Sequence, residues 1–194
     1  MNTVFVDVDT QLDFLYPAGA LYVPGAELLV PIIERLNRHA AAHGITVLST
    51  MDAHTENDPE FRAWPPHCIA GTQGQHKAAA TLLDPRVVVS NCEGAFSLAG
   101  AQQILLEKQT VDAFATVTLP RVLDALGAER YIVYGVVTEV CVIAMAGGLL
   151  AAKKQVAVVE DGVKELRAED GARALAEIRS LGGSVITLSE ALAR

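Results

Sequence analysis

Short apolar runs rich in β-branched residues recur along the chain and are followed by longer segments with helix-like apolar spacing. The short runs predict buried strands, and the longer segments predict amphipathic helices. Strands are expected at residues 3–8, 45–49, 87–90, 131–137, 156–159 and 184–187, and helices at residues 26–43, 120–127, 138–154 and 167–181. This alternation predicts an α/β fold with a mostly parallel central sheet that helices cover on both faces.

Glycines agree with these boundaries, because Gly44 and Gly127 follow expected helices and Gly182 closes the last long one. No repeat or linker interrupts the pattern, so we expect a single domain over residues 1–194. The exception is the segment at residues 52–110, which is long, weakly periodic and rich in proline, glycine and histidine. Such segments are either functional or mobile, and we favour function here.

Composition narrows the class of protein. Hydrophobic residues make up 51% of the chain and charged residues 20%, which is ordinary globular usage and excludes a disordered chain. The 23 acidic residues outnumber the 15 lysines and arginines, which argues against nucleic acid or an anionic membrane as partner. The three cysteines lack paired spacing, and we find neither a basic leader nor a bilayer-length apolar segment. We therefore expect a cytoplasmic protein.

Acidic residues follow the first expected strand, where Asp7, Asp9 and Asp13 stand in the sequence DVDTQLDF. Ligands of open parallel sheets bind beyond the carboxyl ends of the strands, so these positions are candidates for chemistry. Strand alternation would put Asp7 and Asp9 on the same side. The alternative is that the aspartates only stabilise the turn that ends the strand.

Cys141 lies in YGVVTEVC, where a strand runs into a helix with Thr138 as its expected N-cap. The N–H groups and dipole of a first helical turn favour a thiolate, which would make Cys141 a nucleophile. A buried structural cysteine is the alternative, and Cys68 and Cys92 lack this setting. Lys108 ends an apolar run, either as a solvated edge residue or as a cation that positions a nucleophile and a general base.

Histidines and carboxylates gather in MDAHTENDPEFRAWPPHC, directly after the second expected strand. Asp52 and His54 leave the strand on the same side, and loops bring back Glu60 and His67. Two imidazoles with one or two carboxylates suit a divalent metal ion such as zinc, iron or manganese. A polar loop with locally hydrogen-bonded histidines would give the same composition.

Taken in order, these motifs resemble the isochorismatase-like cysteine hydrolases, and within them the nicotinamidase and pyrazinamidase branch. The matching residues are Asp9 in DTQLDF, Lys108 before DAF and Cys141 in GVVTEVC. The resemblance covers nearly the whole chain. It implies that Asp9, Lys108 and Cys141 are catalytic, and that the backbone N–H groups of Val137 and Cys141 form an oxyanion hole. It also implies a cis peptide bond between Val136 and Val137.

The same resemblance implies one divalent metal ion, with zinc as the expected ion, and aromatic side chains that stack on the substrate ring. For Phe114, core packing is an equally good interpretation. The implied metal ligands are Asp52, His54, Glu60 and His67, and the implied substrate-binding residues are Phe14, Trp64 and Phe114.

The activity implied by the resemblance is hydrolysis of nicotinamide to nicotinate and ammonia through a thioester. Three alternatives remain open: a related cysteine hydrolase for another small amide or an N-carbamoyl compound, a hydrolase whose nucleophile is metal-bound water, and a non-catalytic small-molecule binding protein. Small-residue helix faces such as MAGGLLAA suit close packing, and members of the family are often oligomeric, so we expect a homo-oligomer.

Overall fold

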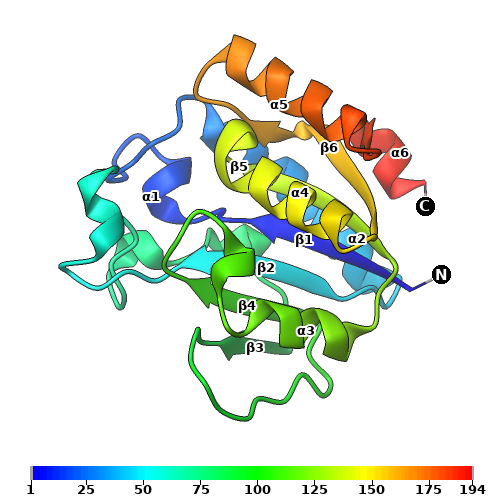
Figure 1. Ribbon diagram of the computed structural model, residues 1–194, viewed down its shortest axis with the longest axis horizontal. Coiled ribbons are helices and arrows are strands. Elements are labelled where there is room, and N and C mark those ends of the chain that lie inside the picture. Colours follow the sequence, from blue (N-terminus) through cyan, green and yellow to red (C-terminus); the bar gives the residue numbers. More distant parts are fainter. Residues whose placement is uncertain (1, 194) are drawn as a thin grey trace.

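The computed structural model describes residues 2–193, which form a sheet of seven strands in the order β3-β4-β2-β1-β5-β6-β7 (Figure 1). The strands are β1 (Thr3–Val8), β2 (Val47–Asp52), β3 (Arg86–Val89), β4 (Gln103–Lys108), β5 (Arg130–Val136), β6 (Gln155–Lys164) and β7 (Ser184–Ile186). Every neighbouring pair is parallel. The α/β class and the parallel sheet predicted from the sequence are therefore confirmed.

Helices cover both faces of this sheet, with α3, α4 and α5 on one face and α2 and α6 on the other; in Figure 1, α4 lies in front of the strands and α2 behind them. Val4, Val6 and Val8 of β1 pack under the first group, whereas Phe5 packs under α2. No helix within residues 2–193 has the length and apolar character to cross a bilayer. The helices are α1 (Leu12–Leu15), α2 (Val30–Ala42), α3 (Leu119–Leu126), α4 (Ile143–Ala151), α5 (Ala168–Ser180) and α6 (Leu188–Leu192).

The structure adds β4, α1 and α6 to the elements expected from the sequence, and β2 continues to Asp52. Strand β4 is difficult to predict because polar residues stand at both of its ends. The first of them, Gln103, is nevertheless buried, and its side chain donates a hydrogen bond to Ser49 Oγ at 2.8 Å. Helix α6 has a readable signal, a capping box in which Thr187 and Glu190 bond each other's backbone. Because β4 lies within residues 52–110, that segment is less irregular than expected.

Close contact between β1 and β5 brings their carboxyl ends together. Gly135 has a φ of 120°, and a Cβ there would lie 2.1 Å from the carbonyl oxygen of Val8. Only glycine tolerates both the backbone conformation and the contact. The residues that follow these strands, Asp9 and Val137, consequently lie at the same edge of the sheet.

Candidate active site

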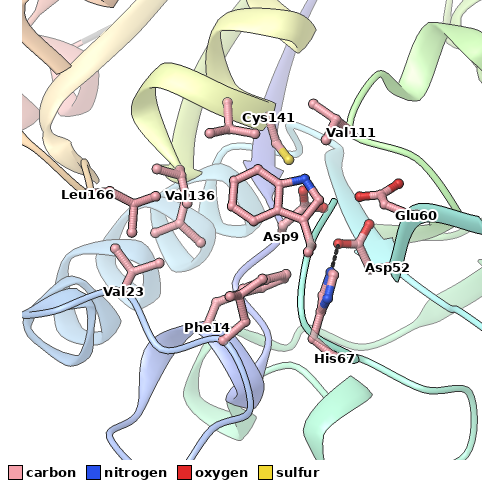
Figure 2. A pocket seen from close by; sticks show the side chains of 14 residues that line it. Asp9, Phe14, Val23, Asp52, Glu60, His67, Val111, Val136, Cys141 and Leu166 are labelled. Atoms are coloured by element: carbon pink, nitrogen blue, oxygen red, sulfur yellow. Dashed lines mark ion pairs between the residues drawn. The ribbon is translucent and has the colours of Figure 1, made fainter. Parts of the chain in front are cut away.

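A pocket opens at the carboxyl ends of the central strands (Figure 2). Its empty volume, with the open mouth included, is about 450 Å³. Apolar side chains form most of the wall, and carboxylates, a histidine and a cysteine complete it. The lining residues are Asp9, Phe14, Leu21, Val23, Asp52, Glu60, Trp64, His67, Val111, Val136, Val137, Val140, Cys141 and Leu166.

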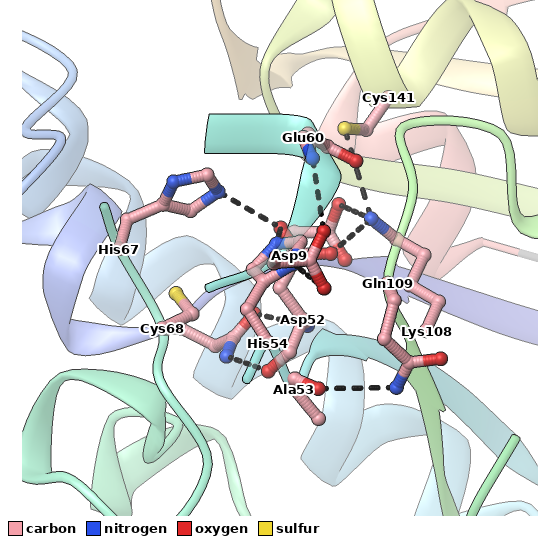
Figure 3. Close-up of polar contacts among 12 residues, drawn as sticks. Asp9, Asp52, Ala53, His54, Glu60, His67, Cys68, Lys108, Gln109 and Cys141 are labelled. Atoms are coloured by element: carbon pink, nitrogen blue, oxygen red, sulfur yellow. Dashed lines mark hydrogen bonds and ion pairs between the residues drawn. The ribbon is translucent and has the colours of Figure 1, made fainter. Parts of the chain in front are cut away.

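Three residues from distant parts of the chain converge at this pocket (Figure 3). Lys108 Nζ lies 3.0 Å from Asp9 Oδ2 and 3.9 Å from Cys141 Sγ. The same ammonium group also bonds Asp52 Oδ1. Asp9, Lys108 and Cys141, which the sequence singled out separately, therefore form one cluster of a carboxylate, a cation and a thiol.

The electrostatics of this cluster keep Cys141 protonated at rest. Burial raises the pKa of the Cys141 thiol well above its ordinary value, against the opposing charge of Lys108. Burial likewise raises the pKa of Asp9. Burial lowers the pKa of Lys108, but Asp52 and Asp9 outweigh this effect and hold the pKa well above its usual value, so the ammonium keeps its charge. The thiolate expected from the helix start is thus opposed by burial.

The turn that carries Cys141 also differs from the prediction. Its N-cap is Val137, one residue before the expected Thr138, and residues Thr138–Val142 form a π-helical turn that leads into α4. Cys141 is therefore the fourth residue of the turn. The peptide bond between Val136 and Val137 is cis, which confirms that prediction. Val137 and Cys141 both line the pocket, as an oxyanion hole built from their N–H groups requires.

A candidate metal centre lies beside the cluster. Potential ligand atoms of Asp52, His54 and His67 all lie within 4.8 Å of one another, and the three residues are buried. His67 Nδ1 is held 2.7 Å from Pro65 O, which leaves Nε2 toward Asp52 Oδ2 at 3.6 Å. His54 Nδ1 lies 3.2 Å from Asp58 Oδ2 and Nε2 lies 3.9 Å from Asp52 Oδ2, although among the described residues neither nitrogen has a well-aligned hydrogen bond. A carboxylate at one ring nitrogen commonly orients a histidine that binds a metal ion through the other, so the donor set fits a divalent ion.

Charges around Asp52 agree with a ligand role. Burial raises the pKa of Asp52, but Lys108 and the two histidines outweigh it and hold the pKa below its usual range. Glu60 is not part of the compact ligand group, although it lines the pocket and is half-buried. Burial, and then the charge of Asp52, raises the pKa of Glu60. That Glu60 is the fourth metal ligand remains a prediction.

The structure separates the three aromatic candidates. Phe14 and Trp64 line the pocket, whereas Phe114 does not. The Phe114 ring packs on α4, where a Cβ at Gly148 would lie 2.2 Å from it. For Phe114 the structure therefore agrees with the core-packing interpretation and places it outside the pocket lining.

Asp7 of β1 and Asp9, which follows the strand, do not lie on the same side of the sheet as the sequence had suggested. The strand ends at Val8, and Asp9 has a φ of 50°, so the alternation stops before Asp9. Asp7 pairs with Lys77 at 3.2 Å, away from the pocket lining. Lys77 cannot be recognised from the sequence, because a buried lysine has no local signature.

Two further residues, which were not singled out from the sequence, hold Asp9 and Asp52 in place. Thr50 donates its hydroxyl hydrogen to Asp9 Oδ1 at 2.7 Å. Gln11 bonds the backbone of Asp52 in both directions, accepting from its N–H at 2.7 Å and donating to its carbonyl at 2.8 Å. Gln11 stands within the motif DTQLDF, which was the available signal, whereas Thr50 is an ordinary residue of a buried strand.

The fold and site together define a class of enzyme. The sequence matches the isochorismatase domain over residues 3–190. Because the match spans nearly the whole chain, this protein belongs to the isochorismatase family, and it is a hydrolase whose named relatives are amidohydrolases. The resemblance seen in the sequence motifs is confirmed.

Individual relatives are more distant. Maleamate amidohydrolase of Pseudomonas putida is 26% identical over 191 residues, which are 95% of this chain and 83% of the relative. Nicotinamidase of Escherichia coli is 24% identical and covers 94% of this chain and 93% of its own. The solved structure of pyrazinamidase of Pyrococcus horikoshii in complex with zinc is 28% identical, with a TM-score of 0.82 over 96% of this chain and 99% of its own.

Proposed function

We propose that this protein is a metal-containing cysteine amidohydrolase that converts nicotinamide and water to nicotinate and ammonia. The observation that carries the proposal is the contact of Lys108 with both Asp9 and Cys141, two residues that line a small pocket. A binding protein has no need of a thiol placed next to a buried carboxylate and a buried ammonium group, because those groups are expensive to bury.

The proposed reaction begins with proton transfer from the Cys141 thiol to Asp9. The sulfur attacks the amide carbonyl carbon, and the resulting oxyanion accepts hydrogen bonds from the N–H groups of Val137 and Cys141. The C–N bond then breaks, and Asp9 returns its proton to the leaving nitrogen, which departs as ammonia. Lys108 holds Asp9 in place and compensates the negative charge of the transient thiolate.

The second half regenerates the enzyme. Asp9 takes a proton from water, and the hydroxyl group attacks the thioester carbon. The C–S bond breaks, the carboxylic acid product forms, and the proton on Asp9 returns to the Cys141 sulfur. One amide bond and one water molecule are consumed, and no oxidant or reductant is needed.

Asp52, His54 and His67, with Glu60 as fourth ligand, would hold one zinc ion in this proposal. When bound, the ion would act as a Lewis acid and orient the substrate through its ring nitrogen. The zinc complex of the Pyrococcus horikoshii pyrazinamidase supports the choice of metal, as does the donor set of imidazoles and carboxylates.

The charges of the pocket favour a neutral amide. Asp9, Asp52 and Glu60 line it, and within residues 2–193 the lining contains neither lysine nor arginine. Lys108 is already engaged by two carboxylates. An amide that carries its own carboxylate, such as maleamate, would find no lysine or arginine in the lining to pair with, whereas a flat neutral ring can stack on Phe14 or Trp64.

An ammonia-release assay tests the proposal. Nicotinamide, pyrazinamide, maleamate and N-carbamoylsarcosine are compared, each with and without a zinc chelator. We expect turnover of the two aromatic amides, a strong loss with chelator, and loss of about 10⁴-fold or more in Cys141→Ala. Cys92→Ala is the matched control, because Cys92 is exposed and free. Wild-type turnover in Cys141→Ala would exclude the thioester route.

A further inference from the structure

The carboxylate of Asp13 joins two loops of the pocket, although Asp13 is not part of the pocket lining. Its Oδ2 accepts a 2.7 Å hydrogen bond from the Cys68 N–H, and its Oδ1 accepts a 2.9 Å bond from the Ala20 N–H. Its backbone carbonyl accepts a third bond, of 3.1 Å, from the Leu21 N–H. Cys68 follows His67 directly, and Leu21 belongs to the apolar wall.

Two glycines pack on Asp13 so closely that a larger residue would collide with it. A Cβ at Gly74 would lie 2.2 Å from Asp13 Oδ2, and a Cβ at Gly19 would lie 2.3 Å from its carbonyl oxygen. Neither glycine has a positive φ, so glycine is needed here for space and not for backbone conformation. Gly74 therefore leaves room for the carboxylate of Asp13, and Gly19 leaves room for its backbone.

Cys68 passes this restraint to the candidate metal centre. Its φ of 44° is uncommon for a residue other than glycine and is held while Asp13 binds its N–H. Its carbonyl oxygen accepts a 3.1 Å hydrogen bond from the His54 N–H. The backbone of Cys68 thus lies between the two histidines, next to one in sequence and bonded to the other.

We propose that Asp13 is a positioning residue that sets the place of His67 in the metal centre and of Leu21 in the pocket wall. Zinc affinity and substrate affinity then depend on the same residue, whose carboxylate bonds Cys68 next to His67 and Ala20 next to Leu21. The inference rests on the metal centre of the proposed function. Partners that orient metal ligands commonly contribute about 10- to 100-fold in metal affinity.

The test is Asp13→Asn, which keeps the size of the side chain but turns one accepting oxygen into an NH₂ group that faces a backbone N–H. Zinc affinity of the metal-free protein, measured by competition with a chromogenic chelator, should fall about 10- to 100-fold. At saturating zinc, the KM for nicotinamide should rise more than kcat falls, because the loop of the wall loses its bond from Ala20 to the carboxylate while Cys141 stays in place.

Asp161→Asn is the matched control, because the Asp161 carboxylate also accepts a long-range backbone N–H, from Leu188 at 2.6 Å, but lies outside the pocket lining. Wild-type zinc affinity in Asp13→Asn, or an equal loss in Asp161→Asn, would overturn the proposal. If Asp13→Asn does not fold, Gly74→Ala presses on the carboxylate without changing it and must weaken zinc binding; unchanged affinity there overturns the proposal as well. Failure of the metal centre itself is distinguishable, because the wild type would then bind no zinc.

Discussion

Two buried aspartate–lysine pairs begin on the same stretch of chain, and only one of them faces the pocket. Asp7 lies 3.2 Å from Lys77, and Asp9 lies 3.0 Å from Lys108. All four side chains are at most 1% exposed. Burial and charge alone therefore do not distinguish the pair proposed for catalysis from its neighbour.

Hydrogen bonding does distinguish them. The Thr10 hydroxyl donates to one oxygen of Asp7 at 2.7 Å, and the Ser49 hydroxyl donates to the other at 3.1 Å. Asp9 Oδ1 accepts from Thr50, but among the described residues Asp9 Oδ2 has only the ion pair with Lys108. Hydrogen bonds to both oxygens suit Asp7 to a structural role, whereas Asp9 Oδ2, which accepts none, can take up a proton.

The largest effect is expected for Asp9→Asn compared with Asp7→Asn. Loss of the general base should lower kcat by about 10²- to 10⁴-fold in Asp9→Asn. Asp7→Asn should instead lower the free energy of unfolding and leave kcat of the folded protein near the wild-type value. Steady-state kinetics and urea unfolding of both variants measure the contrast, and a similar kcat loss in both would remove it.

Lys77→Met tests the structural pair from its other end. Removing the cation leaves Asp7 as an uncompensated buried charge, which should cost about 3–5 kcal/mol of unfolding free energy. Arg86→Met is the control, because Arg86 pairs with Asp84 at 2.9 Å on the surface, where such a pair contributes at most about 1 kcal/mol. Equal urea midpoints for the two variants would contradict the assignment of Lys77.

The smallest effect is expected for Thr50→Val, which removes the hydroxyl that orients Asp9 but keeps the shape of the side chain. Loss of one hydrogen bond to a charged group should lower kcat about 10-fold with little change in KM. Thr50→Ser retains the hydroxyl and should restore most of the rate. If the serine and valine variants were equally slow, packing and not hydrogen bonding would explain the role of Thr50.

Much of the fold could be predicted from the sequence, because buried parallel strands and amphipathic helices leave different periodicities. The prediction failed where local pattern and tertiary setting diverge. Strand β4 has a buried polar residue at each end, Gln103 and Lys108, and the partners of both come from elsewhere in the chain. The alternation of β1 was extended one step too far, to Asp9, because a positive φ outside glycine has no sequence signal.

Only those residues of the site that belong to recognisable sequence motifs could be predicted. The resemblance brought Asp9, Lys108 and Cys141 together, and the structure places them in one cluster. Residues that act through those three, such as Thr50, became visible only in three dimensions. The raised pKa of Cys141 was equally hidden, because it comes from burial, which depends on the whole fold, whereas the sequence shows only the helix position that favours a thiolate.

A nucleophile that holds its proton until a substrate arrives has a consequence for oxidative damage. Peroxide and alkylating reagents react with thiolates, so the resting enzyme offers them little at Cys141. The exposed sulfur of Cys92 is the more accessible target. The raised pKa that makes a general base necessary thus also lowers the reactivity of the Cys141 sulfur between turnovers.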